Sequence, residues 1–196
     1  MKRCLLALSV LLTALPVAAQ TSTWNIDPNH STAQFTVRHM AVSNVTGTFN
    51  KVSGTAQMAD KDLTKSSVDA IIDVASVDTR VEMRDKDLRS DHFFDVAKYP
   101  TIEFKSKRIE KQGDGYKLVG DLTMHGVTRE VSLNVDQPSP IVTDQRGNMR
   151  RGFEATTTIN RKDWGMTYNN LLQTGEAVVG DTIKIQVDVE LLKPKS

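Results

Sequence analysis

Strand-like alternation of apolar and polar side chains runs through most of this chain. The segment before the C-terminus shows it most clearly, because five apolar residues from Ile183 to Leu191 interleave with five polar ones from Thr182 to Glu190. A period of two puts successive side chains on opposite faces of a β-strand. One face of each such strand meets water and the other does not, so the pattern predicts an all-β fold.

Seven further segments carry the same signature, and short connections between them predict antiparallel pairing. Gly47 and Gly54 fall inside one long segment, where glycines typically mark the bends of a closing barrel. We therefore expect an eight-stranded antiparallel, lipocalin-like barrel with one or two short helices. The predicted strands are Ser31–Met40, Val45–Ala59, Ser66–Val77, Thr101–Glu110, Tyr116–Met124, Val127–Asp136, Arg150–Asn160 and Val178–Leu192.

Two segments lack the alternation. From Asp78 to Tyr99 acids and bases crowd together, which predicts a short helix followed by a loop, with Asp78 as a candidate N-cap. The second segment runs from Lys162 to Gly175. We expect both to cover a sheet edge or to close one end of the barrel.

The N-terminus has the features of an export signal. Two basic residues precede an apolar stretch from Leu5 to Val17, and a run of small residues ends at Ala19. This arrangement predicts a signal peptide over residues 1–19, followed by one barrel domain over residues 20–196. Thirteen apolar residues are too few to span a bilayer, so we expect no stable membrane span.

Cleavage would also change the cysteine count and the charge. It removes Cys4, the single cysteine, together with two of the 25 basic residues, which leaves 23 against 24 acidic residues and takes the formal charge from +1 to −1. An exported chain of this size without disulfides fits a bacterial periplasm, which is the predicted location. The near-neutral balance argues against a nucleic-acid partner.

Catalytic and metal-binding signatures are missing from the sequence. It has no Gly-x-Ser-x-Gly elbow, no His-Glu-x-x-His and no phosphate-cradling glycine loop. The four histidines, at positions 30, 39, 92 and 125, lie on different predicted segments without metal-ligand spacing. We therefore expect a protein that is not an enzyme, with no catalytic residue, no metal and no cofactor.

Small side chains dominate the face expected to point inward, including Ala33, Ala70, Gly120, Ala155 and Thr157. The large inward residues are too few to fill a long lumen, and eight strands make a barrel that is either just filled or wide enough for one ligand. The pattern favours a ligand cavity, with a solid core as the alternative. Its expected lining is Phe35, Val37, Phe49, Ile72, Val74, Phe93, Phe104, Leu118, Leu122, Met124, Phe153, Trp164 and Ile185.

Four polar residues are candidates for a polar mouth that contacts a ligand's head group: Arg38, His39, Arg89 and His92. An arginine fork suits a phosphate or a quinone oxygen. The alternative for Arg38 and His39 is a salt bridge at a strand end. For Arg89 and His92 it is a solvated helix face with ion pairs four residues apart.

Several separated blocks, in order from Thr23 to Leu192, resemble the YceI-like family of bacterial exported lipid-binding proteins. The matching pieces are WNIDPNHSTAQFTVRH, SVDTRVEMRDKDLRSDHFFDVAKYPTIEFKS, GDLTMHGVTREVSL, INRKDWGM and VVGDTIKIQVDVEL. The resemblance implies an extended periplasmic barrel of lipocalin type. It also implies a long isoprenoid ligand, such as a polyprenyl diphosphate or a ubiquinone-type molecule.

Three functional classes stay open on the sequence. The favoured one is a periplasmic binding or carrier protein that encloses an isoprenoid or a related lipid. The alternative is a small-molecule enzyme acting on a lipid at the barrel mouth, and a third class is a solid structural barrel that binds another protein. A homodimer through an exposed strand edge is a further possibility.

Overall fold

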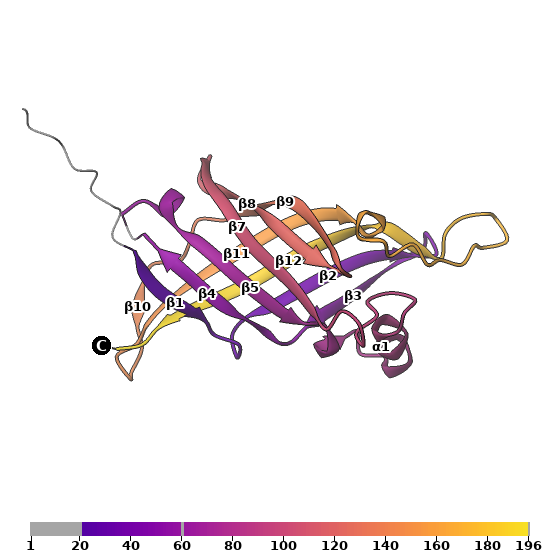
Figure 1. Cartoon of the computed structure of the whole chain (residues 1–196), viewed down its shortest axis with the longest axis horizontal. Coiled ribbons are helices and arrows are strands. Elements are labelled where there is room, and N and C mark those ends of the chain that lie inside the picture. Colours follow the sequence, from indigo (N-terminus) through magenta and orange to yellow (C-terminus); the bar gives the residue numbers. More distant parts are fainter. Residues whose placement is uncertain (1–20, 60, 196) are drawn as a thin grey trace, which may run out of the picture.

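The chain forms one continuous sheet that closes into an elongated barrel (Figure 1). The computed structural model describes residues 21–59 and 61–195. The strands are β1 (Ser22–Ile26), β2 (Thr32–His39), β3 (Ser43–Phe49), β4 (Val52–Met58), β5 (Ser67–Asp73), β6 (Val77–Asp78), β7 (Thr101–Gln112), β8 (Gly115–Met124), β9 (Val127–Val135), β10 (Val142–Thr143), β11 (Met149–Asn160) and β12 (Val179–Lys193). The helical elements are α1 (Glu82–Arg89) and the 3-10 turns η1 (Leu63–Lys65), η2 (Val74–Ser76) and η3 (Arg161–Trp164). None of the described helices is long and apolar enough to cross a membrane.

Barrel closure depends on β12, the longest strand. One side of β12 pairs with β11 along its length, from Lys193 to Thr182. The other side pairs with β1 near Leu191 and then with β2. β1 and β2 therefore count as one strand of the barrel with a corner in its middle. In the same way β3 and β4 form one interrupted strand, and β5 and β6 form another. With β7, β8, β9, β11 and β12 they make a closed barrel of eight antiparallel strands, which confirms the predicted fold class.

The interruptions follow from local sequence. The predicted strand Val45–Ala59 consists of β3 and β4 with a break at residues 50–51. Gly54 has φ +143°, and a β-carbon there would lie 2.1 Å from the carbonyl oxygen of Asp69. Only glycine allows β4 to approach β5 this closely. β1 is missing from the predicted set because its five residues are too short to display a periodic pattern.

The predicted helix lies within residues 78–99 but begins later than expected. α1 starts after Val81, whose side chain makes no cap hydrogen bond, so Asp78 is not its N-cap. The Asp78 carboxylate instead accepts from the backbone N–H of Arg80 at 2.7 Å, in a turn where Arg80 has φ +65°. Asp85, on the first turns of α1, accepts from the backbone N–H of Thr79 at 2.8 Å and fixes the helix to β6.

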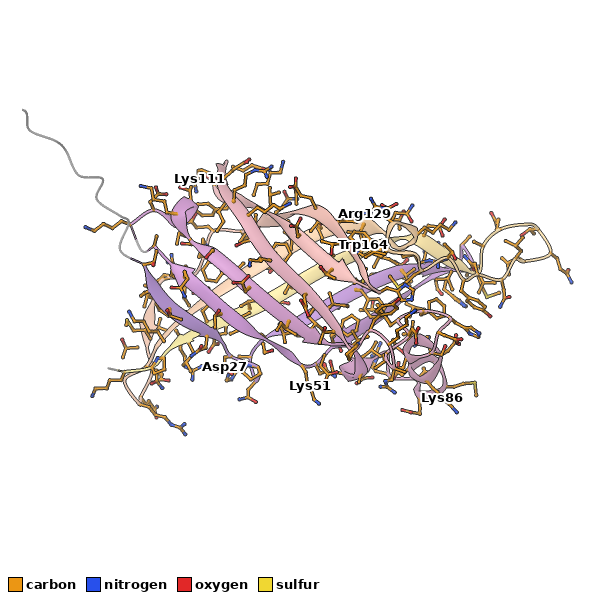
Figure 2. The ribbon with its side chains drawn as sticks, viewed as in Figure 1. Asp27, Lys51, Lys86, Lys111, Arg129 and Trp164 are labelled. Atoms are coloured by element: carbon orange, nitrogen blue, oxygen red, sulfur yellow. The ribbon has the colours of Figure 1, made fainter. Side chains whose placement is uncertain are left out.

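The two non-strand segments lie at the same end of the barrel. Figure 1 shows α1 and the long connection after η3 at one end, whereas β10 and the C-terminus lie at the other. Trp164 of η3 lies near Arg129 of β9 and far from Lys111 at the end of β7 (Figure 2), and Arg129 donates to the carbonyl oxygen of Asp163 at 3.2 Å. Both segments therefore lie at one end of the barrel, which is one of the two positions expected for them.

Candidate functional site

The barrel encloses an elongated apolar cavity of about 280 Å³, close to the low end of the roughly 300–1,000 Å³ typical of ligand pockets. On β12 its wall extends from Val179 to Leu191, about 40 Å along a strand. The cavity reaches Leu63 of η1 and Tyr116 of β8 toward one end, and Leu88 of α1 toward the other. It therefore runs along most of the barrel.

Inward apolar side chains keep accessible surface because the lumen that they face is not filled. Leu118, Leu122, Phe153, Ile185 and Val187 all line the cavity and are only half-buried. The side chains of a close-packed core would have almost no accessible surface. Between the two alternatives that the sequence left open, the structure favours the ligand cavity over the solid core.

Glycines explain why large inward side chains do not block the lumen. A β-carbon at Gly47 would come within 2.5 Å of the Phe35 ring, and one at Gly120 within 2.5 Å of the Phe104 ring. The missing β-carbons let both rings lie flat over the neighbouring strands, as aromatic side chains do over glycines in other sheets. Both rings line the cavity and add apolar surface to its wall.

Most residues predicted to line the cavity do line it. These eleven are Phe35, Val37, Phe49, Ile72, Phe93, Phe104, Leu118, Leu122, Met124, Phe153 and Ile185. The prediction is wrong for Val74 and Trp164. They are 1% and 2% exposed and pack in the core, and neither lines the cavity. Both belong to 3-10 turns, where period-two alternation no longer says which way a side chain points. That the lining residues contact a ligand stays a prediction.

The predicted polar mouth does not form on the cavity wall, which includes none of Arg38, His39, Arg89 and His92. Arg38 donates to a carbonyl oxygen of the β2–β3 turn at 2.8 Å, and His39 ends β2. Arg89 donates to two carbonyl oxygens beside η2, at 2.7 and 3.1 Å. His92 pairs through Nδ1 with Asp87 at 2.9 Å. Arg38, Arg89 and His92 are thus held by bonds to neighbouring segments. That any of the four residues contacts a ligand's head group stays a prediction.

Arg161 is the charged residue on the cavity wall, and the candidate residues did not include it. It is 3% exposed, and burial lowers the pKa of its guanidinium while Asp181 opposes that shift. All five of its N–H donors are used. They bond the carbonyl oxygens of Met166, Tyr168, Val179 and Gly180 and the Asp181 carboxylate. Arg161 therefore fastens the connection between η3 and β12 and has no donor left for a ligand. The one sequence feature that could have pointed to Arg161 is its place in the INRKDWGM block.

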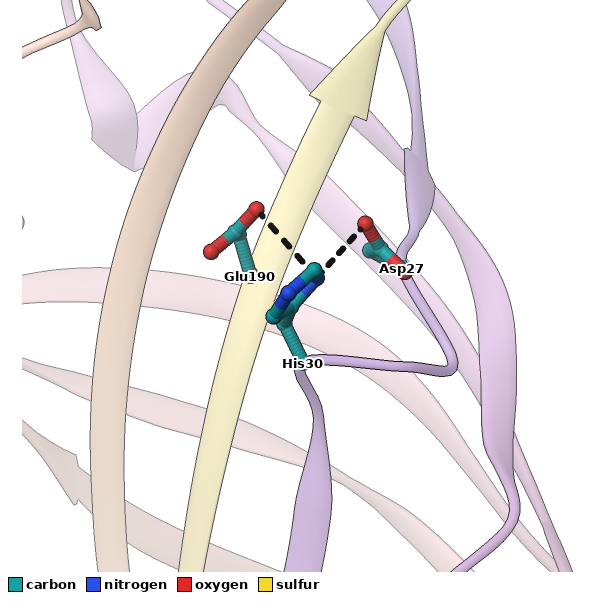
Figure 3. A group of neighbouring side chains, drawn as sticks. All are labelled: Asp27, His30 and Glu190. Atoms are coloured by element: carbon teal, nitrogen blue, oxygen red, sulfur yellow. Dashed lines mark hydrogen bonds and ion pairs between the residues drawn. The ribbon is translucent and has the colours of Figure 1, made fainter.

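A cluster of acids and a histidine lies outside the cavity, at the corner between β1 and β2 (Figure 3). Ligand atoms of Asp27, His30 and Glu190 all lie within 4.8 Å of one another, which is compatible with a metal ion. However, Arg150 Nη1 donates to Asp27 Oδ2 at 2.8 Å and to Glu190, and Arg150 Nε donates to Asp144 at 2.9 Å. The cation that these carboxylates face is the guanidinium, so the geometry is that of a salt-bridge network.

This network predicts an acid-sensitive contribution to stability. Burial opposes ionisation of Asp27, but hydrogen bonds from His30, from Arg150 and from a backbone N–H outweigh it and lower the pKa to about 2. The folded-state pKa lies below the ordinary value of 3.8. The stabilisation is therefore complete above about pH 4 and is lost as the pH falls toward 2.

Arg150→Met is expected to lower the free energy of unfolding at pH 7 by about 2–4 kcal/mol, because it leaves Asp27 buried without its cation. The deficit relative to the wild type should shrink below about pH 4, where Asp27 becomes protonated in the variant. Urea unfolding at several pH values measures this. Arg151→Met, which removes the same charge from the neighbouring residue, is the control. A deficit that does not change with pH would contradict the role of Asp27.

Comparison with known proteins finds relatives that match most of the chain. A UPF0312 protein of Yersinia pestis is 38% identical over 138 residues, which cover 70% of this chain and 71% of that protein. A UPF0312 protein of Pectobacterium atrosepticum is 36% identical over 166 residues, which cover 83% and 84% of the two chains.

Solved structures share the same barrel. BcnA of Burkholderia cenocepacia superposes with a TM-score of 0.71 at 22% identity, over 84% of this chain and 98% of that one. The YCEI protein of Campylobacter jejuni gives a TM-score of 0.66 at 28% identity, over 81% and 90%. A domain of Saccharophagus degradans described as polyisoprenoid binding gives a TM-score of 0.61 at 17% sequence identity, over 87% of this chain and 98% of that one. The YceI-like domain description matches residues 24–191, nearly all of the barrel. The chain belongs to the YceI-like family.

Proposed function

We propose that the protein binds a long apolar lipid of the isoprenoid class inside its barrel and carries or stores it in the periplasm. The observation that carries this proposal is the cavity, a long lumen whose wall is almost entirely hydrocarbon. A polyprenyl diphosphate or a ubiquinone-type molecule has a tail of the matching shape. The shared fold of the Saccharophagus degradans polyisoprenoid binding domain supports the same ligand class.

Tail burial is sufficient for useful affinity. A buried methylene contributes about 0.8 kcal/mol, so one five-carbon prenyl unit contributes at most about 4 kcal/mol. Association and ordering cost several kcal/mol or more. A few enclosed units therefore give roughly micromolar binding without a strong head-group contact. Because Arg161 has no free donor, we infer that the tail rather than the head group determines affinity.

We infer binding rather than turnover from the same wall. General acid–base catalysis most often uses a histidine or a carboxylate within reach of the reacting atoms, and a serine or threonine nucleophile needs such a base beside it. No described histidine, aspartate or glutamate lines the cavity. Thr157, one of the few hydroxyl groups on the wall, donates to the carbonyl oxygen of Ser132 at 2.8 Å. These observations favour a carrier over the alternative of a lipid-modifying enzyme.

Native mass spectrometry of the protein recovered from the periplasmic fraction of its own host tests both parts of the proposal. We expect the mass of a chain that lacks residues 1–19, with an additional mass that dissociates as a lipid built from prenyl units. Recovery in the cytosolic fraction with residues 1–19 retained would contradict export. A protein that is consistently empty, or that converts an added polyprenyl alcohol to a product, would contradict the carrier function.

A further inference from the structure

Exposed apolar side chains are concentrated at the end of the barrel that carries α1. Of the nine large apolar side chains that are exposed among the described residues, six lie there, in three pairs that we call the apolar tips. The tips are the β2–β3 turn with Met40 and Val42, the start of α1 with Val81 and Met83, and the connection after η3 with Tyr168 and Leu171. The most exposed members are Val42, Met83 and Leu171, at 78%, 83% and 71%.

Direct contacts join the three tips into one end surface. The backbone N–H of Met40 donates to the carbonyl oxygen of Val178, which links the β2–β3 turn to the connection before β12 at 2.7 Å. The Tyr168 ring stacks on His92 with centroids 4.1 Å apart. His92 in turn pairs with Asp87 on α1 at 2.9 Å. The tips are therefore held at the same end of the barrel by packed and hydrogen-bonded segments.

Each tip continues an element that also forms the cavity wall. Leu88 of α1 lines the cavity, while Met83 of the same helix faces solvent. Val37 lines the cavity three residues before Met40 on the β2 side of the turn, and Met166 lines it two residues before Tyr168. Exposed hydrocarbon outside the barrel thus adjoins enclosed hydrocarbon inside it, at this end of the lumen.

We propose that the apolar tips dock this end of the barrel onto the surface of a lipid bilayer, where the isoprenoid enters and leaves the cavity. This inference rests on the proposed function, because an isoprenoid that leaves the cavity needs an apolar phase to receive it. Three separated protruding pairs suit insertion between lipid head groups, whereas a protein partner would favour one contiguous apolar patch. Tyrosine is a side chain typical of a membrane interface.

Charges around the tip that carries α1 are nearly balanced, so we expect apolar insertion to be the main attraction to the membrane there. The segment from Asp78 to His92 carries four arginines and lysines against five aspartates and glutamates. A polybasic surface would bind anionic lipids and release them in salt. The proposed docking should instead persist at high ionic strength.

Vesicle flotation tests the proposal with the exported form of the protein and vesicles of phosphatidylethanolamine and phosphatidylglycerol. We expect the wild type to float, and the triple variant Val42→Ser, Met83→Ser, Leu171→Ser to partition at least about tenfold less. The control is Ile141→Ser with Val142→Ser, two exposed apolar residues at the start of β10 at the opposite end, and this variant should float like the wild type. All five side chains are exposed, so circular dichroism should show unchanged folding.

A parallel measurement separates docking from ligand binding. A dansyl-labelled polyprenyl alcohol offered from detergent micelles should bind the wild type and the triple variant with affinities within about twofold, while uptake from vesicles should be slower in the triple variant by about tenfold. The docking proposal would be overturned, and the carrier function left intact, if the wild-type protein bound the probe but did not float with vesicles. A triple variant that floats like the wild type would have the same meaning. Failure of every variant to bind the probe from micelles would contradict the carrier function itself.

Discussion

Ala155→Phe is expected to displace the lipid while the barrel stays folded. Ala155 lies on β11 with its side chain on the cavity wall, opposite Val187 of β12. A benzyl group there enters the lumen and occupies the space of about one prenyl unit. Loss of about 3–4 kcal/mol of tail burial corresponds to an affinity at least about 100-fold lower. Fluorescence titration with a labelled polyprenyl alcohol measures the change.

The neighbouring position provides the control for this substitution. Thr156→Phe introduces the same side chain on the same strand, but Thr156 is exposed on the outer face of the barrel. Its affinity should stay within about twofold of the wild type. A second substitution that fills the lumen, Leu118→Trp on β8, should cause a similar loss of affinity. If Ala155→Phe keeps full affinity while remaining folded, the ligand does not lie in this part of the lumen.

Trp164→Ala is expected to cause a large loss of stability, about 3–5 kcal/mol. The indole is 2% exposed, and its Nε1–H donates to the carbonyl oxygen of Leu122 at 3.1 Å. The carbonyl oxygen of Trp164 faces His125 Nδ1 at 3.1 Å, so η3 is attached to β8 and to the β8–β9 turn. Truncation would leave a void and an unpaired carbonyl group. In a chain of this size the melting temperature should fall by about 6–20 °C.

A conservative replacement distinguishes packing from hydrogen bonding at this position. Trp164→Phe keeps most of the buried volume and loses only the bond to Leu122, so it should cost about 1–2 kcal/mol. Thermal unfolding followed by circular dichroism compares the two variants. If Trp164→Ala melts within about 2 °C of the wild type, η3 does not contribute to the core as described.

The strands and the direction of their side chains could be predicted because both follow from one periodic pattern. Along β11 and β12 the alternation continues without interruption from Phe153 to Ile159 and from Ile183 to Leu191. Each inward residue on these stretches therefore appears on the cavity wall. The pattern says nothing about how far the opposite wall lies, so the sequence left the choice between a solid core and a cavity open.

Residues outside the strands were harder to place. Val74 continued the alternation of the predicted strand Ser66–Val77, and Trp164 was a candidate as a large aromatic residue. The backbone turns at both positions, and their side chains pack in the core. Arg161 was missed because a basic residue after a strand normally faces water. Only the tertiary structure brings to it the carbonyl oxygens that satisfy a buried guanidinium, from residues 166 to 180.

The strands that close the barrel come from the two extremes of the described chain. Asn25 of β1 pairs with Leu192 of β12, so almost all of the described residues lie between the two partners. Contacts this distant in sequence form late and slowly. While the nascent chain is still being synthesised, β1 and β2 lack their β12 partner and no lumen exists. Ligand loading must therefore follow synthesis of β12, and a product truncated before β12 would expose its apolar inner face, which favours aggregation.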